Sequence, residues 1–239
     1  MKEQHMSWRS VGAFGLAVAL LATTAQSAPG QDTRPGIAVF TFENGGSYGQ
    51  DKEVFDALQV GLQQILITEL ASNQSLRIVD RSRIKDLVAE QDLGAAGRVD
   101  ANTAARIGRL VGARYAVLGG FIDFYGDFRI DARIVNVETS EIVKPVKVQD
   151  KRDRLYTLVV SLANELTRGV NLPPLPRQAM EERQAREVPT EALTLYSRAL
   201  LYADRGDSNR AIELYNRAIE VFPDYTEAKE ALRQLRPGE

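Results

Sequence analysis

Residues 115–137 read YAVLGGFIDFYGDFRIDARIVNV, and this stretch decides the fold. Residues 115–124 are strongly apolar, which is typical of a buried strand. The following residues alternate instead: one side carries Phe128, Ile130, Ala132 and Ile134, and the other carries Arg129, Asp131 and Arg133. Such an alternation indicates a strand with one buried face and one solvated face. The stretch therefore predicts two consecutive β-strands.

Further strands are predicted on both sides of this stretch. Residues 138–141 indicate a hairpin turn, after which residues 142–149 return antiparallel. Pro145 places this returning strand at an edge of the sheet, because proline has no N–H to donate to a central ladder. Toward the N-terminus, residues 37–42 predict a buried strand and residues 76–79 a short one.

Segments with apolar residues at three- and four-residue spacing separate the strands and predict helices. These helices cover about residues 51–73, a segment that begins at Asp80 or Ser82, residues 100–111 and residues 153–168. The order of elements is strand, helix, strand, helix, helix, strand, hairpin, helix. We therefore expect an α/β domain over residues 36–171, with a small mixed β-sheet packed with helices.

The first 27 residues have the pattern of a secretory signal peptide. Lys2 and Arg9 give a positive start, residues 11–22 are an apolar and small-residue run, and small residues precede a cleavage point before Ala28. A retained membrane anchor is the alternative reading, but a span needs about 20 apolar residues. The pattern predicts export to the periplasm, and no later segment is long and apolar enough to predict membrane insertion.

The composition excludes several functional classes. The 239 residues carry 30 Lys and Arg against 32 Asp and Glu, a balance that argues against nucleic-acid binding. The chain has no cysteine, and its single histidine, His5, would leave with the signal peptide. Catalysis by Ser-His-Asp or Cys-His groups and metal sites built on Cys or His are therefore excluded in the exported form. We expect no cofactor and no metal.

The C-terminal part begins after a proline-rich segment. Residues 172–186 read as a linker, since LPPLP at 172–176 is followed by a charged segment. Residues 187–236 have the pattern of a tetratricopeptide (TPR) unit with a capping helix; the matching positions are Ala199, Tyr202, Gly206, Asp207, Ala211, Tyr215, Ala218 and Pro223. The C-terminal part is thus predicted to be an all-α hairpin.

One TPR unit is too small to bury a core alone, since three or more repeats usually stack. We expect the hairpin to pack against the first domain, a second copy of itself or a partner. The predicted partner contacts on the TPR surface are Leu195, Arg198, Tyr202 and Tyr215. Tyr48 and Tyr125 lie in glycine-containing loops and are candidate loop contacts.

Several motifs resemble the CsgG family. They are IVDRSRI at 78–84, LVAEQ at 87–91, ARIGRLVGARYAVLG at 105–119 and IVNVET at 134–139, and together they span roughly residues 36–170. The family includes the curli-subunit secretion channel and holdfast anchors, and periplasmic activators of peptidoglycan synthases are similar. The resemblance implies a small α/β periplasmic domain without catalytic activity.

This chain departs from the outer-membrane members of that family in two ways. It lacks the acylated N-terminal cysteine, and its two turns after residues 124 and 137 are too short for the membrane-spanning hairpins of the channel. The resemblance therefore implies the soluble domain. Asp123, Asp127 and Asp131 do not suggest a metal site, because residues four apart in a strand are about 13 Å apart.

The basic residues Arg77, Arg81, Arg83 and Lys85 have two interpretations, a contact for an acidic partner or anionic glycan and a solvated face. The function we expect is that of a non-enzymatic, exported envelope protein that acts by protein–protein contact in assembly, secretion or regulation. Its expected partners are envelope proteins bound through the TPR unit, and a second copy of the chain is a further candidate partner. Two alternatives stay open. One is a carboxylate-based glycan hydrolase that uses acids such as Glu43 and Asp123, and the other is a ring-forming structural protein.

Overall fold

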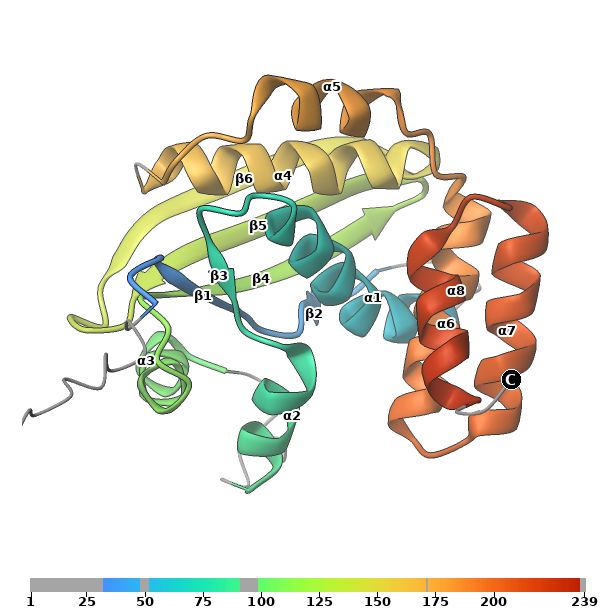
Figure 1. Ribbon diagram of the computed structural model, residues 1–239, viewed down its shortest axis with the longest axis horizontal. Coiled ribbons are helices and arrows are strands. Elements are labelled where there is room, and N and C mark those ends of the chain that lie inside the picture. Colours follow the sequence, from blue (N-terminus) through green and yellow to red (C-terminus); the bar gives the residue numbers. More distant parts are fainter. Residues whose placement is uncertain (1–31, 48–51, 91–98, 171, 237–239) are drawn as a thin grey trace, which may run out of the picture. The chain divides into compact units, whose positions relative to one another are not determined.

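A computed structural model describes residues 32–47, 52–90, 99–170 and 172–236 of the chain (Figure 1). These residues fall almost entirely in the compact unit Arg34–Glu239. The expected signal peptide at 1–27 and the loop contact Tyr48 lie outside the described residues. Within the described ranges, no helix is both long and apolar enough to cross a bilayer.

A mixed sheet forms the centre of the unit, with the strand order β3-β1-β4-β5-β6 and β2 paired to β4. β1 runs parallel to β3 and to β4, whereas β4, β5 and β6 form an antiparallel meander. The bounds are β1 Gly36–Val39, β2 Glu43–Asn44, β3 Arg77–Ile78, β4 Tyr115–Phe124, β5 Asp127–Asn136 and β6 Ile142–Lys151. The predicted α/β class and mixed sheet are confirmed, and β6, which contains Pro145, is the edge strand that the proline indicated.

Helices cover both faces of this sheet. α1 (Lys52–Ala71) and α4 (Leu155–Gly169) pack on the face that carries Ile37, Val117 and Ile130. α2 (Arg81–Glu90) and α3 (Ala101–Leu110) pack on the opposite face, against Ala38 and Leu118 among others. The alternation along β5 explains the division, because Phe128, Ile130 and Ile134 are fully buried under α1 and α4 while the residues between them point to the other face.

The first strand is shorter than the sequence predicts. The apolar run at 37–42 suggests one continuous strand, but β1 ends at Val39. After it, the Phe40 N–H still donates to Val117, whereas the Phe42 N–H donates to the Gln59 carbonyl of α1 instead of a strand. After Val39 the chain thus leaves the sheet toward α1, while the side chains of Phe40 and Phe42 stay buried. Pairing with β4 resumes only at β2.

Four helices follow the sheet domain. They are α5 (Arg177–Ala185), which lies along α4, then α6 (Thr190–Asp204), α7 (Ser208–Val221) and α8 (Thr226–Leu235), with the 3-10 turn η2 (Arg152–Arg154) preceding α4 (Figure 1). Gly206 makes the turn between α6 and α7 with φ +80°, a conformation that favours glycine. Asp207 caps α7 by accepting the Arg210 N–H.

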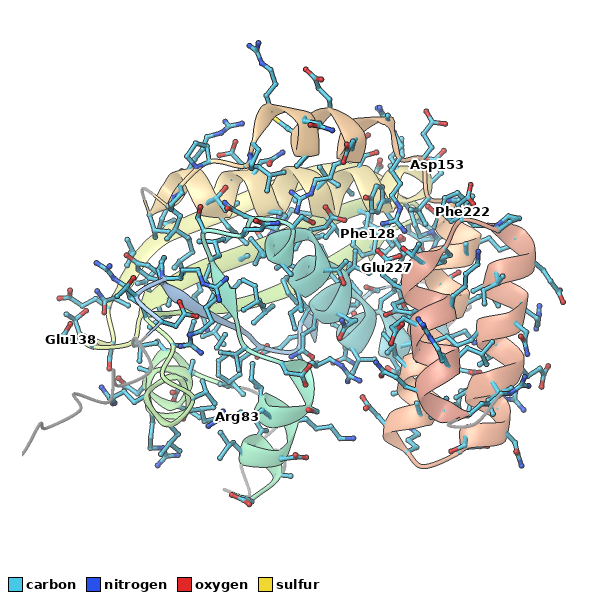
Figure 2. The ribbon with its side chains drawn as sticks, viewed as in Figure 1. Arg83, Phe128, Glu138, Asp153, Phe222 and Glu227 are labelled. Atoms are coloured by element: carbon cyan, nitrogen blue, oxygen red, sulfur yellow. The ribbon has the colours of Figure 1, made fainter. Side chains whose placement is uncertain are left out.

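The α6–α7 hairpin shares one hydrophobic core with the sheet domain. α6 packs along α1, and at their crossing Gly61 faces Ser197, which is completely buried. Of the three packing surfaces expected for the hairpin, the structure shows the first one, the sheet domain of the same chain. In Figure 2, Phe222 just after α7 and Glu227 in α8 lie on the side of the C-terminal helices, while Glu138, in the turn between β5 and β6, lies at the far end of the sheet.

Candidate functional site

A groove opens beside the carboxyl ends of the parallel strands β1 and β3. The chain leaves β1 toward α1 on one face of the sheet and leaves β3 toward α2 on the other face. In open α/β sheets, neighbouring strands with oppositely directed connections leave a crevice between them, and ligands bind at this switch point. The position of the groove is therefore a consequence of the topology.

The groove has a volume of about 740 Å³ and a mainly apolar lining. Its sheet side consists of Phe40, Thr41, Phe42, Glu43, Leu118, Gly119, Gly120, Asp131, Ala132, Arg133 and Pro145. Its other walls consist of Gln59, Val60 and Gln63 of α1, Arg81, Ile84, Lys85, Val88 and Ala89 of α2, Val99, and Leu201 and Asp204 of α6. Because α6 is part of the TPR hairpin, both parts of the unit build the groove.

An ion-pair cluster ties α2 to α6 at the edge of the groove. Arg81 binds the Asp204 carboxylate with two hydrogen bonds, at 2.5 and 3.1 Å, and Lys85 lies 3.2 Å from the same carboxylate. The side chains of Arg81 and Asp204 are mostly buried. Of the four basic residues singled out in the sequence, Arg81 and Lys85 meet an acidic side chain, Asp204 of the same chain. Arg77 instead donates to the Gly112 carbonyl.

The other polar side chains of the groove differ in whether they form hydrogen bonds or ion pairs within the chain. Gln63 donates to the Val39 carbonyl at 2.7 Å and accepts from the Thr41 hydroxyl at 3.1 Å. Asp131 is bound by Arg129 at 2.6 Å. In contrast, the side chains of Gln59 and Arg133 have no hydrogen bond or ion pair to any residue that the structure describes. These two side chains are therefore available to a ligand.

The acids considered for hydrolysis do not meet in the groove. Glu43 lines it, but Asp123 does not. Asp123 is completely buried in the β4–β5 hairpin, where it accepts the Gly126 N–H at 2.9 Å and lies 3.4 Å from Arg152. Among the described residues, no group of three or more His, Asp or Glu side chains could hold a metal ion.

None of the four predicted TPR contacts is freely exposed: two are buried and two bind the sheet domain of the same chain. Leu195 and Tyr215 are buried, with 5% and 1% of their surface exposed. Arg198 and Tyr202 both bind the Glu53 carboxylate of α1 at 3.0 Å. In this structure α1 binds Arg198 and Tyr202, so these two side chains are not free for a separate partner.

The candidate loop contact Tyr125 lies at the tip of the β4–β5 hairpin. It is 80% exposed and adopts φ +53°, followed by Gly126 at φ +91°. Two consecutive positive φ angles define a type I′ turn, where Asn-Gly is the favoured pair and a tyrosine is strained. Its ring packs edge-on against Phe124, which is also largely exposed. An exposed aromatic residue kept at a strained position is consistent with a contact role.

The strain at Tyr125 predicts a gain in stability on substitution. Tyr125→Asn should raise the free energy of unfolding by about 0.5–1 kcal/mol, because asparagine tolerates the left-handed conformation better. Urea unfolding followed by circular dichroism measures the change. Tyr202→Asn is a control in which a helical tyrosine is lost, and it should destabilise the chain. A Tyr125→Asn protein less stable than wild type would show that the ring stabilises the hairpin.

Sequence reasoning missed a buried polar cluster between α1, α4, α5 and α8. Arg183 of α5 lies 2.9 Å from the Glu69 carboxylate of α1, which also accepts the Tyr156 hydroxyl at 3.0 Å. Nearby, Arg186 binds Glu227 of α8 through two hydrogen bonds at 2.5 and 2.7 Å. The signal that could have revealed this cluster is weak, because Glu69 lies on the apolar face of its helix but its partner is more than one hundred residues away.

The pKa values of the two glutamates in this cluster, Glu69 and Glu227, shift in opposite directions. Burial raises the pKa of Glu69, and the charge of Arg183 offsets this only in part. Burial would also raise the pKa of Glu227, but the hydrogen bonds and charge of Arg186 hold that pKa below its ordinary value. The ionised form of Glu227 therefore favours the folded state.

The lowered pKa of Glu227 predicts a pH-dependent stability. Ionised Glu227 stabilises the fold above pH 4.5, the ordinary pKa of glutamate, and this contribution is lost as the pH falls through the lower pKa of the folded state. Glu227→Gln should cost about 1–2 kcal/mol at pH 7, and the difference from wild type should shrink below pH 4.5. Urea unfolding between pH 3 and 7 tests this. A difference that is constant across the range would contradict it.

The candidate site thus consists of a groove and a hairpin tip on a mixed α/β scaffold that carries a helical hairpin. Residues 19–128 match the family model described as the curli production assembly/transport component CsgG, and residues 192–225 match the tetratricopeptide repeat model. The chain therefore has a CsgG family domain followed by a TPR repeat, as the motifs predict. The TPR match covers α6 and α7.

Three solved structures illustrate the similarity. The LpoB C-terminal domain from Salmonella enterica is 21% identical, with 49% of this chain and 83% of that chain covered and a TM-score of 0.37. A PelC dodecamer from Paraburkholderia phytofirmans is 13% identical, with 59% and 90% covered and a TM-score of 0.37. Lipoprotein GNA1162 from Neisseria meningitidis is 10% identical, with 55% and 96% covered and a TM-score of 0.40.

Of these three, GNA1162 is described as a lipoprotein and PelC as a dodecamer. No curated protein matches the chain in sequence.

Proposed function

We propose that this chain is a non-enzymatic, exported envelope protein that acts by protein–protein contact in the assembly, secretion or regulation of periplasmic machinery. The observation that carries the proposal is the combination of a CsgG family domain with a TPR repeat, since TPR units bind proteins. The signal-peptide pattern of residues 1–27 supports export to the periplasm, where the protein associates with the outer membrane through a partner.

The proposed division of labour follows the sequence boundaries. Residues 36–171 serve as the α/β scaffold, residues 172–186 as a connection that includes α5, and residues 187–236 as the TPR unit with its cap. Because α1 already occupies the predicted contact face of α6, the surfaces that support binding to another protein are the groove and the Tyr125 hairpin tip.

Two features support a role without catalysis. The exported form has no histidine or cysteine. In addition, two of the groove carboxylates are already engaged within the chain, since Arg129 binds Asp131 at 2.6 Å and Arg81 binds Asp204 at 2.5 Å.

Crosslinking in the native organism tests the proposal. The full-length chain with a C-terminal tag is treated with a short crosslinker in intact cells, and its adducts are identified by mass spectrometry. We expect the protein in the periplasmic or outer-membrane fraction, with its N-terminus at Ala28 and crosslinked to a defined envelope protein. A cytoplasmic protein, or one that forms no envelope adduct at any crosslinker concentration, would contradict the proposal.

A further inference from the structure

Part of the sheet face that α2 and α3 cover is open to solvent, and this part is basic. On β5 and β6 the residues that point to this face include Arg129, Arg133 and Lys147, all of which are exposed or half-exposed. Two acids lie among them: Asp131, which is opposite Lys147 in the register and bound by Arg129, and Asp127, which is bound by Lys151 of β6. The open face therefore carries an excess of positive charge next to the groove.

The groove borders this basic face, and most of its lining is apolar. Arg133 lines the groove at the point where the open face meets it, with Leu118 and Pro145 as its neighbours across the strands. The lining includes the buried apolar side chains of Phe40 and Ile84 and the half-buried Leu201. A ligand that matches this arrangement has an apolar group next to negative charge.

The side-chain amide of Gln59 distinguishes between two classes of ligand, a peptide and a lipid acyl chain. Gln59 presents a side-chain amide, which can both donate and accept, and it has no partner among the residues that the structure describes. A peptide backbone supplies an acceptor and a donor at each residue, whereas a hydrocarbon chain supplies neither. Gln59 thus favours a peptide over the acyl chain of an anionic lipid.

We propose that the groove binds a short segment of a partner protein, with an aliphatic side chain in the pocket between α2 and α6 and adjacent acidic residues over Arg133 and the basic face of β5 and β6. This inference rests on the proposed function and assigns its partner-binding site. The Arg81–Asp204 pair, which joins α2 to α6, holds the two walls at the spacing that the segment needs.

A peptide selection tests the inference directly. The full chain without residues 1–27 is immobilised, and a phage library of random nonapeptides is selected against it. We expect enrichment of sequences with one or two aliphatic residues flanked by Asp or Glu. Synthetic copies of the enriched peptides are then measured by fluorescence polarisation, and their binding should weaken as the salt concentration rises.

Two variants probe the two halves of the site. Ala89→Trp, at an exposed lining position of α2, fills the pocket and should weaken binding at least about tenfold. Arg133→Glu should weaken it by about ten- to hundredfold, as expected for loss of a charge-assisted contact. Ala71→Trp and Arg217→Glu make the same changes at exposed positions outside the groove and should leave the affinity unchanged.

The possible outcomes separate this inference from the proposed function. A selection that yields no peptide, or peptides that bind Ala89→Trp and Arg133→Glu as well as wild type, would overturn the inference. So would binding to phosphatidylglycerol vesicles that depends on Arg133 while no peptide binds. If envelope adducts still form in cells in those cases, the proposed function stands and the partner binds elsewhere.

Discussion

Replacing Gly61 with leucine should separate the TPR hairpin from the sheet domain. A Cβ atom at this position would lie 2.5 Å from the Ser197 Cβ and 3.2 Å from its Cα, closer than side chains can approach. Ser197 cannot turn away, because it is completely buried and its hydroxyl donates to the Leu193 carbonyl at 2.8 Å. α1 and α6 must therefore move apart, and both belong to the shared core.

The expected cost of Gly61→Leu is about 2–3 kcal/mol in the free energy of unfolding. Overpacking of a core costs about 1–3 kcal/mol, occasionally more, while removing a glycine from a helix returns only about 1 kcal/mol. Urea unfolding measures the loss. Limited proteolysis with trypsin measures the separation, since the chain should be cut faster at Arg177 and Arg186, in the segment between the two parts, once the hairpin is no longer held on the sheet domain.

A compensating pair shows whether the close contact is the cause. Gly61→Ala alone should destabilise the chain, and Ser197→Gly in the same protein should restore much of the loss because it removes the atoms that clash. Ser197→Gly alone is the matched control for the cost of a glycine in α6. If Gly61→Leu were as stable as wild type, α1 and α6 could separate freely, and the hairpin would not depend on the sheet domain.

The parts of the fold that the sequence predicts are those that one local pattern determines. The alternation along β5 is decisive because one of its faces is fully buried, so a shift by one residue would expose Phe128 and Ile130. The edge position of β6 follows from Pro145 in the same way. The end of β1 cannot be predicted from a local pattern, because Phe40 and Phe42 are buried whether or not they pair in the sheet.

The groove depends on contacts between segments that are distant in the sequence, and no local sequence pattern predicts it. Arg81 and Lys85 are visible in the sequence as part of a basic run, but their partner, Asp204, lies more than one hundred residues away on α6. The TPR positions Arg198 and Tyr202 are likewise recognisable as contact residues, whereas the identity of the contact, Glu53, depends on how α6 docks on α1. Local periodicity gives the elements, and the docking of the elements gives the site.

Arg183→Met should be the most destabilising single change among the charged residues. Arg183 and Glu69 are 9% and 3% exposed in their side chains, and loss of the cation leaves a buried carboxylate without its charge partner. Breaking a buried ion pair from one side costs about 3–5 kcal/mol. Tyr156→Phe, which removes only the hydroxyl that donates to Glu69, should cost about 1 kcal/mol, and urea unfolding compares the two variants.

The deficit of Arg183→Met should depend on pH in a defined direction. Burial already raises the pKa of Glu69 in the folded state, and loss of the Arg183 charge raises it further. The ionised carboxylate then opposes folding above its raised pKa, and the deficit should shrink as the pH falls from 7.5 toward the ordinary value of 4.5. In Glu227→Gln the deficit instead persists down to pH 4.5 and shrinks only below it, so unfolding curves of the two variants between pH 3 and 7.5 distinguish the two ion pairs.

A double replacement separates the cost of an unpaired charge from a loss of packing. Glu69→Leu with Arg183→Met removes both charges and keeps similar side-chain volume, so it should recover most of the stability that Arg183→Met alone loses. If the double variant were as unstable as the single one and its deficit did not vary with pH, packing of the Arg183 side chain would be the cause. A restored variant would show that the deficit of Arg183→Met comes from the Glu69 carboxylate, which is left buried without its charge partner.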